Sequence, residues 1–391
     1  MIATGLDRFS KGEYRRYRKT RVGILCHSAS VDATLSHIST TLPQKKFGLN
    51  VTCLFGPQHG IRAEKQDNMI ESSDFRDGRS GLPVFSLYSS TREPTDLMFS
   101  NIDVLLVDLQ DIGTRIYTFM YTLAGCMRAA KRLQKRIVVL DRPNPIGGSA
   151  VDGNVLETGF ESFVGQFPIS TRHGMTLGEL ACLFNEGFGI GCDLEVIEVR
   201  GWKRSQDATL WHRDWIPPSP NIPSLTSAQL FPGMVHFEGT NVSEGRGTCK
   251  PFEWIGAPYI EDPDGLAKEM NLKKLPGVHF RPLFFQPSFQ KWSGEVCGGV
   301  QVHVLDAKRL QATRTGWHLL ESIARLYTGK FEWKQPPYEY EYERLPIDLI
   351  AGTSRLRVAV TAGSGLKAFE AESKLGLQEF LKRRRRFLLY G

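Results

Sequence analysis

The sequence has no long apolar segment and no signature of a nucleotide cofactor. No stretch is long enough to span a bilayer, and the first residues, MIATGLDRFSKGEYRRYRK, contain no apolar core of signal-peptide length. The one glycine cluster of nucleotide-binding type, Gly187–Gly191, follows a helical pattern instead of joining a strand to a helix. A phosphate-binding loop of the Walker type is also missing. We therefore expect a cytoplasmic protein with no cofactor and no membrane partner.

The cysteines show no pattern of a disulfide framework or a metal site. There are seven, an odd number, and they are widely scattered without a CxxC pair. This distribution is typical of small buried thiols in a reducing compartment. The sequence also lacks a GxSxG nucleophile elbow and an HExxH zinc motif. We expect no bound metal and no thiol or serine nucleophile.

The overall composition is that of an ordinary globular protein with a small positive excess. With 391 residues, two domains are expected, and the net charge of +7 comes partly from the run KRRRR at Lys382–Arg386. Such a run can bind nucleic acid, but no aromatic residues alternate with it and no nucleic-acid module accompanies it. The solvated end of a helix is the favoured interpretation, because cations suit that end of the helix dipole. We expect no nucleic-acid partner, and the oligomeric state stays open.

The first half predicts a mostly parallel sheet. Apolar runs of five or six residues predict strands at Arg21–Cys26, Asn50–Phe55, Pro83–Tyr88, Ile102–Leu109, Arg136–Asp141 and Leu194–Val199. Helical patterns separate several of them, at Ala33–Leu42, Ile116–Leu133 and Leu177–Phe188. Nearly continuous apolar strands alternating with helices indicate a sheet that is covered on both faces.

The second half predicts a smaller α+β domain. The composition turns rich in proline around Trp215–Pro232, so we place a domain boundary nearby, with residues 1–210 in the α/β domain and 211–391 in the second. Strands are predicted at His279–Phe285 and Val296–Val304, and helices at Leu310–Leu326 and from about Leu366. The segment Phe237–Tyr259 has few apolar positions and is predicted to be a long polar loop.

Polar residues follow three of the predicted strands at the point where each ends. These groups are Gln58 and His59 in GPQHG, the run QDIGTRIYT with Asp111, Arg115 and Tyr117, and Arg142 with Asn144 in RPNP. In open parallel sheets ligands bind beyond the carboxyl ends of the strands. Three polar loops at one edge therefore indicate a site, although a histidine such as His59 equally often caps a turn.

The polar segment of the second half supplies further candidates. Glu238, Asn241, Glu244 and Arg246 lie within nine residues, and Phe252, Trp254 and Tyr259 follow them. Flat aromatic walls with a few directed carboxylates and amides suit a carbohydrate, whose rings offer apolar faces and hydroxyl edges. We expect a small carbohydrate ligand in a cleft between the two domains.

Several long motifs resemble one family. VDLQDIGTRIYTF, LDRPNP, SPNIPS, FEGTNVSEGRGT, PFEWIGAPY and the terminal LLY are similar to the exo-β-N-acetylmuramidase family, and the similarity runs nearly from end to end. The resemblance implies a Rossmann-like domain plus a smaller auxiliary domain with the active site in the cleft between them. It also implies hydrolytic removal of N-acetylmuramic acid from the non-reducing ends of peptidoglycan fragments.

One position departs from the family's pattern. The corner in characterised members resembles PEHG, whose glutamate is the favoured catalytic residue, and this chain has Gln58 there. An amide neither donates a proton as a carboxylic acid does nor acts as a carboxylate base. Either another acid replaces it or the chemistry has changed.

The first hypothesis is therefore a glycosidase acting on sugars that contain N-acetylmuramic acid. The alternatives are a sugar-binding protein that has lost turnover and a different enzyme in the same cleft. The candidate catalytic residues are His59, Glu64, Asp111, Glu238 and Glu244. The candidate substrate-binding residues are Gln58, Arg115, Tyr117, Arg142, Asn144, Asn241 and Arg246.

Overall fold

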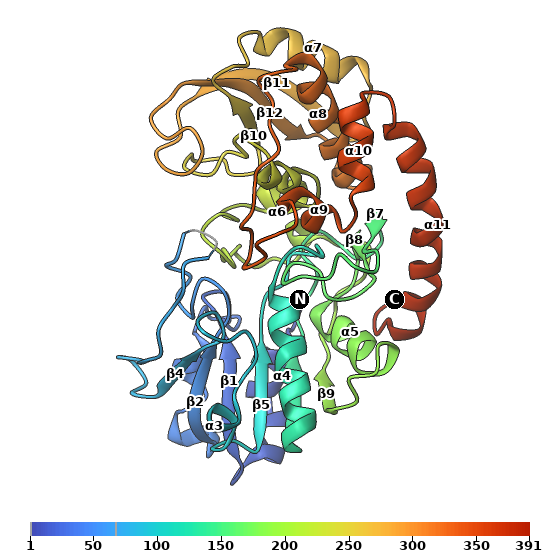
Figure 1. Cartoon of the computed structure of the whole chain (residues 1–391). Helices are drawn as coiled ribbons and strands as arrows, with labels where there is room; N and C mark the ends of the chain where they lie inside the picture. Colours follow the sequence, from blue (N-terminus) through green and yellow to red (C-terminus); the bar gives the residue numbers. More distant parts are fainter. Residues whose placement is uncertain (1, 67–68) are drawn as a thin grey trace.

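The computed structural model describes residues 2–66 and 69–391. Its two larger sheets lie in different parts of the molecule (Figure 1). The larger sheet has the strand order β3 (Phe75–Arg76), β4 (Pro83–Ser86), β2 (Asn50–Gly56), β1 (Arg21–Cys26), β5 (Val104–Asp108), β6 (Arg136–Leu140), β9 (Asp193–Ile197). All neighbouring strands are parallel except β3 and β4. The predicted α/β class is confirmed.

The period of two in the strands explains why helices cover both faces of this sheet. Val22, Ile24, Leu106 and Leu140 pack into one apolar cluster with α1 (Gly5–Lys11) and α2 (Ile38–Thr41). The alternate residues, such as Leu105, Val107 and Val139, pack into another cluster with α3 (Asp96–Phe99), α4 (Phe119–Leu133) and α5 (Leu177–Cys182). Successive strand side chains point to opposite faces, so near-continuous apolar strands fill both.

The second domain is built on an antiparallel sheet in the order β10 (Trp254–Ala257), β12 (Cys297–Val304), β11 (Val278–Phe285). Its helices are α6 (Leu225–Met234), α7 (Pro263–Leu272), α8 (Ala312–Leu326), α9 (Pro346–Ala351), α10 (Arg355–Ala362) and α11 (Leu366–Arg384). The hairpin of β7 (Asp152–Val155) and β8 (Ser170–Arg172) lies between the two sheets (Figure 1).

Two sequence predictions need correction. Residues 33–42 form a helix only at Ile38–Thr41, because Asp32 Oδ1 accepts hydrogen bonds from the amides of Thr34 and Ser36 and holds a turn there. The segment Phe237–Tyr259 is largely buried and contains strand β10, so it is not an exposed loop. Its polar groups have hydrogen-bond partners inside the protein, so the segment can be buried although few of its residues are apolar.

The chain crosses between the domains more than once. Helix α11 runs along one side of the molecule and brings the C-terminal residues down to α5 (Figure 1). There Tyr390 Oη donates a hydrogen bond to Asp141 Oδ2 at 2.6 Å and accepts one from the amide of Val199 at 3.0 Å. Asp141 directly follows β6, and burial raises the pKa of its carboxyl to about 7.

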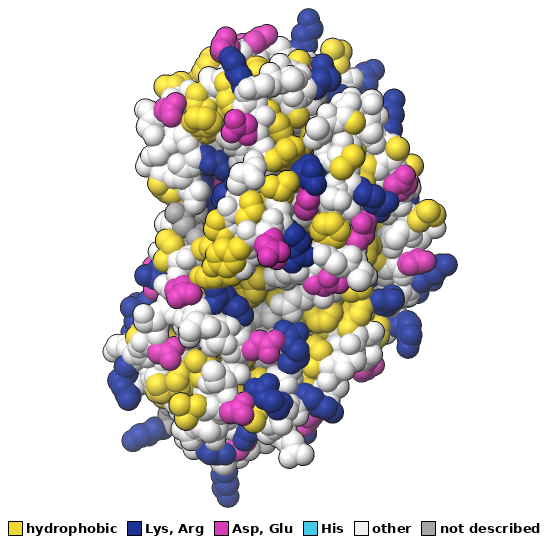
Figure 2. Space-filling view, viewed as in Figure 1, with side chains coloured by type: hydrophobic (Ala, Val, Ile, Leu, Met, Phe, Trp, Pro, Cys, Tyr) yellow, Lys and Arg dark blue, Asp and Glu magenta, His cyan; other side chains and the backbone are white. Residues whose placement is uncertain are grey.

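The outline of the molecule is indented where the two domains meet (Figure 2). On the face shown there, Lys and Arg side chains are spread over both domains and form no continuous stripe. Within residues 2–66 and 69–391, no helix is long and apolar enough to cross a membrane.

Replacing Tyr390 by phenylalanine tests the link between the C-terminal residues and the larger sheet. The change removes a donor from the buried Asp141 carboxyl and an acceptor from Val199, so we expect the free energy of unfolding to fall by about 1–3 kcal/mol. Urea-induced unfolding measures it. Tyr342→Phe, at an exposed position, is the matched control, and equal effects of the two changes would contradict the prediction.

Candidate functional site

The corner after β2 is a tight turn that buries its polar side chains. The Gly60 amide donates to the Pro57 carbonyl at 3.0 Å, and both His59 and Gly60 have positive φ. His59 Nδ1 lies 2.7 Å from the carbonyl oxygen of Lys65. Gln58 is only 4% exposed, so its amide is cut off from water and needs partners in the protein.

The side chain of Gln58 joins both domains. Its Oε1 accepts a hydrogen bond from Thr118 Oγ1 at 2.6 Å, at the start of α4. Its Nε2 donates to Tyr88 Oη at 3.1 Å and to Glu339 Oε1 at 3.0 Å. Tyr88 Oη in turn donates to Glu339 Oε2 at 2.6 Å. The amide therefore has its carbonyl directed to the first domain and its NH₂ group to a carboxyl of the second.

Glu339 lies on a segment that we call the strap, residues 335–345, which crosses from the second domain to the first. Glu339 and Tyr340 both have positive φ, a left-handed conformation that is uncommon for residues other than glycine. The guanidinium of Arg92 lies 3.8 Å from the ring centre of Tyr340 and 4.5 Å from that of Tyr88. The cation contacts both rings, whose planes make an angle of 74°, and so fastens the strap to the first domain.

Burial controls the charge of Glu339. Removal from water raises the pKa of its carboxyl above the ordinary value, and the nearby Glu238 raises it further. Hydrogen bonds from Tyr88 and Gln58 and the charge of Arg246 favour the ionised form, but they do not outweigh these effects. Glu339 therefore keeps its proton to a higher pH than an ordinary glutamate does.

A second carboxyl group lies in the same region. Arg246 Nη2 is 2.6 Å from Glu238 Oε1, and Tyr338 Oη donates to Glu238 Oε2 at 2.8 Å. Behind this pair, Glu244 lies 2.8 Å from Lys291 Nζ and 3.7 Å from Arg246 Nε. Burial opposes ionisation of Glu244, but the two cations outweigh it and lower its pKa. Glu244 thus acts as a fixed negative charge that holds Arg246.

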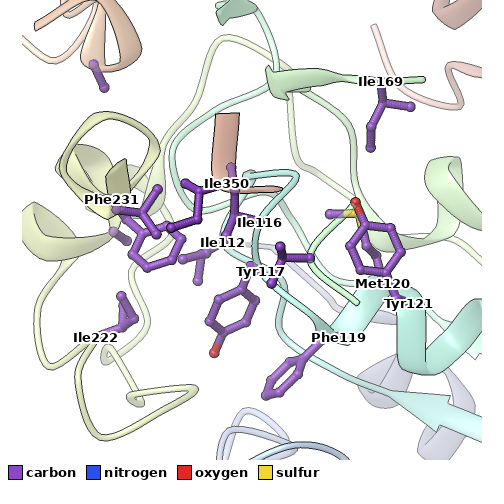
Figure 3. Packing of buried hydrophobic residues seen from close by; sticks show 14 of the residues in the cluster. Ile112, Ile116, Tyr117, Phe119, Met120, Tyr121, Ile169, Ile222, Phe231 and Ile350 are labelled. Atoms are coloured by element: carbon purple, nitrogen blue, oxygen red, sulfur yellow. The ribbon is translucent and has the colours of Figure 1, made fainter. Parts of the chain in front are cut away.

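These groups line a cavity of about 40 Å³ between the domains. Its polar lining is formed by Gln58, His59, Thr118, Ser219, Asn221, Glu238, Arg246, Tyr338 and Glu339. One wall is aromatic: Tyr117 stands between Phe119 and Ile222, with Phe231 beyond (Figure 3). The Tyr117 and Phe119 ring centres are 4.7 Å apart, and Phe231 contacts Phe252 at the same distance. Carboxyl groups facing aromatic rings suit a sugar.

A larger cavity, of about 620 Å³, lies beyond the ends of β1 and β5. This is the point where the strand order reverses, and ligands of open sheets commonly bind there. Its two arginines are engaged in ion pairs, Arg142 with Asp108 at 2.6 Å and Arg213 with Asp7 at 2.5 Å, and its carboxyl groups, Asp32 and Asp214, are not buried. We favour the smaller cavity as the reactive site, because buried carboxyl groups face it.

The structure brings together five of the twelve residues selected from the sequence. Gln58, His59, Tyr117, Glu238 and Arg246 line the smaller cavity. Glu244 supports Arg246 from behind. Arg142 borders the larger cavity instead.

The other five predicted residues lie outside the lining of either cavity. Arg115 is fully buried and donates to the carbonyls of Ile350 and Ala351, and burial lowers its pKa to about 10. Asn144 donates to the carbonyl of Met175, and Asn241 to that of Lys330. Asp111 accepts from the amide of Gly113, and Glu64 is exposed. Four of these five side chains therefore bind backbone groups, three of them in other segments of the chain.

Sequence reasoning missed Tyr88, Thr118, Tyr338 and Glu339. Glu339 lies in YEYEYE, whose alternating acids are typical of a solvated surface, so the sequence gives no local signal for its burial. In the described residues, no group of three or more His, Cys, Asp or Glu side chains is arranged to hold a metal ion.

Comparison with known proteins identifies relatives over the whole chain. Residues 22–226 match the family model described as exo-beta-N-acetylmuramidase NamZ, N-terminal, and residues 229–390 match its C-terminal counterpart. The peptidoglycan beta-N-acetylmuramidase NamZ of Bacillus subtilis is 39% identical over 389 residues, covering 100% of this chain and 91% of the relative.

Two solved structures share the fold. Both are DUF1343 family proteins from Bacteroides fragilis. One superimposes with a TM-score of 0.88 at 32% identity, and the other with 0.76 at 27%, each covering 100% of this chain and 99% of the other.

Replacing Arg92 by methionine tests whether its guanidinium holds the strap. The loss of a cation between two rings costs about 0.5–2 kcal/mol, so amide exchange of Tyr338 and Glu341 should accelerate about 2- to 30-fold. Hydrogen exchange measured by mass spectrometry gives these rates. Arg383→Met removes a similar contact, with Phe188, at a distant position and serves as control. Unchanged exchange in the strap would contradict this role.

Proposed function

The chain belongs to the exo-beta-N-acetylmuramidase NamZ family, and from this membership we propose that it removes N-acetylmuramic acid from the non-reducing ends of peptidoglycan fragments. One observation supports a location for this activity in the molecule. The corner after β2, the start of α4 and the segment from Glu238 to Arg246 come from distant parts of the sequence and line a single cavity.

The chemistry of this cavity suits hydrolysis of a glycoside. Glycosidases commonly use two carboxyl groups, one that gives a proton to the leaving oxygen and one that stays ionised. The cavity contains Glu339, whose pKa is raised by burial, and Glu238, which is bound to Arg246. A buried carboxyl group and a carboxyl group paired with a guanidinium therefore face the same cavity.

The lining also supports the proposed recognition of a sugar. Tyr117, Phe231 and Phe252 offer flat surfaces for a sugar ring, and the amide of Asn221 offers a polar partner for a hydroxyl or acetamido group. N-acetylmuramic acid differs from N-acetylglucosamine by a lactyl ether with a carboxylate. Of the three arginines among the candidate substrate-binding residues, Arg246 alone lines this cavity, and a guanidinium fork suits such a carboxylate.

We further propose that the protein works in the cytoplasm on small muropeptide sugars. All seven cysteines are free, and most are buried. Free thiols persist in a reducing compartment, and this supports the location.

Incubation of the protein with muropeptides that carry N-acetylmuramic acid at the non-reducing end tests the function. We expect release of free N-acetylmuramic acid, detected by mass spectrometry, and no release from fragments that end in N-acetylglucosamine. Binding of the sugar without any release would instead support a sugar-binding protein, and the absence of both would contradict the proposal.

Replacing Arg246 by lysine tests the origin of specificity. Lysine keeps the charge but loses the fork, and a hydrogen bond to a charged group contributes about 1.5–3 kcal/mol, so kcat/KM for the muramic acid substrate should fall about 10- to 100-fold. Turnover or binding of the matching N-acetylglucosamine compound should change much less. Arg132→Lys, in an exposed ion pair on α4, is the control. An equal loss for both sugars would contradict recognition of the lactyl carboxylate by Arg246.

A further inference from the structure

The Gln58 corner and the strap form one unit at the reactive cavity. Glu339 Oε1 and Oε2 each accept one hydrogen bond, from Gln58 and Tyr88, at 3.0 and 2.6 Å. The carboxyl is 5% exposed and lines the cavity that also contains Glu238. Gln58 is thus in direct contact with a buried carboxyl group of the second domain.

The hydrogen-bond network fixes the direction in which the Gln58 amide points. The single proton of Tyr88 Oη is given to Glu339, so Tyr88 accepts at 3.1 Å from Gln58 and at 3.0 Å from the amide of Met69. Gln58 must therefore present its NH₂ group to Tyr88 and Glu339, while its carbonyl accepts from Thr118. A glutamate at position 58 has no such donor and would share a proton with Glu339.

The backbone supports a special role for this residue. Glu339 has a φ of 48° and Tyr340 one of 66°. Residues other than glycine rarely adopt this region, and they persist there where the surroundings hold them in place. Here the surroundings are the Arg92 cation between Tyr340 and Tyr88, together with the bonds to the carboxyl itself. Together these contacts hold the Glu339 carboxyl group at the cavity.

We propose that Glu339 is the catalytic acid of this chain and that Gln58 is the positioning residue that holds it. This inference rests on the proposed glycosidase function. In the step assigned to Glu339, the bond between the anomeric carbon and the leaving oxygen breaks, and its electron pair stays on that oxygen. The leaving oxygen takes the proton of Glu339. Water then supplies a hydroxyl group to the anomeric carbon, and its remaining proton restores Glu339.

The charged and titratable groups around Glu339 determine how the acid titrates. Those that face it from the packed elements are Tyr88, Tyr338, Tyr340, Glu238, Arg246 and His59. Burial and the carboxylate of Glu238 raise the pKa of Glu339, and Arg246 with the two hydrogen bonds opposes them. A general acid works in its protonated form, so activity should be full at low pH and fall as the pH rises through this raised pKa.

The first test replaces Glu339 by glutamine, which keeps the size of the side chain and removes the proton donor. We expect kcat to fall about 10²- to 10⁴-fold with KM changed only a few-fold. Glu343→Gln, an exposed acid on the same strap, is the matched control. Should Glu339→Gln fail to fold, Glu339→Asp keeps the carboxyl group, and we then expect partial activity. A wild-type kcat in Glu339→Gln would overturn the assignment. If Glu339→Asp is used instead, complete loss of activity in the folded variant would overturn it.

The second test is Gln58→Glu, followed over a range of pH. The change removes a hydrogen-bond donor that favours ionised Glu339 and adds a like charge about 3 Å away. Both effects raise the pKa of Glu339, so the falling limb of kcat should move to higher pH while activity persists. A profile identical to that of the wild type would show that Gln58 does not position the acid.

The outcomes distinguish this inference from the proposed function. Release of N-acetylmuramic acid by the wild type together with normal turnover by Glu339→Gln rejects Glu339 and leaves the function standing. The absence of release by the wild type rejects both. Calorimetry measures whether Glu339→Gln still binds N-acetylmuramic acid. Retained binding with lost turnover would show that the variant lacks the acid and not the binding site, and it would support the inference.

Discussion

A carboxyl group that is cut off from water must find its hydrogen-bond partners in the protein, and Glu339 finds them in the other domain. Gln58 and Tyr88, both from the larger sheet's domain, bind its two oxygens. Glu238 is held within its own domain by Arg246 and by Tyr338 of the strap. The lining of the candidate cavity is therefore complete only when the domains are docked, and the buried polar groups make this docking specific.

Much of the fold could be predicted from the sequence because its signal is local. Strand β1 coincides with its predicted limits, and the other predicted strands agree to within a few residues, since continuous apolar runs leave little choice of conformation. The predicted helix at 33–42 was mostly wrong because one side chain, Asp32, captured the amides of the next residues. Short strands such as β7 and β10 were missed, because packing rather than sequence pattern defines them.

The lining of the candidate cavity could be predicted only where the strand topology determines the position of a residue. The rule for strand ends found the corner with Gln58 and His59, since the carboxyl end of a buried strand has to open at that edge. Arg115 has the same polarity and a similar place in the sequence, yet its side chain is bound by backbone carbonyls. Glu339 was missed, because nothing in an alternating acidic run indicates that one of its members enters a cavity.

The size of the cavity sets how a sugar can enter it. Pockets for small ligands commonly measure about 300–1,000 Å³, whereas this one holds about 40 Å³ and is bordered by Tyr338 and Glu339 of the strap. For a sugar ring to bind at this candidate site, part of the wall has to move, so we expect binding to be coupled to an opening step of the protein. The observed association rate should then level off at high sugar concentration instead of rising in proportion to it. We therefore expect the contacts of Arg92 that fasten the strap to slow both the entry of the sugar and the release of the product.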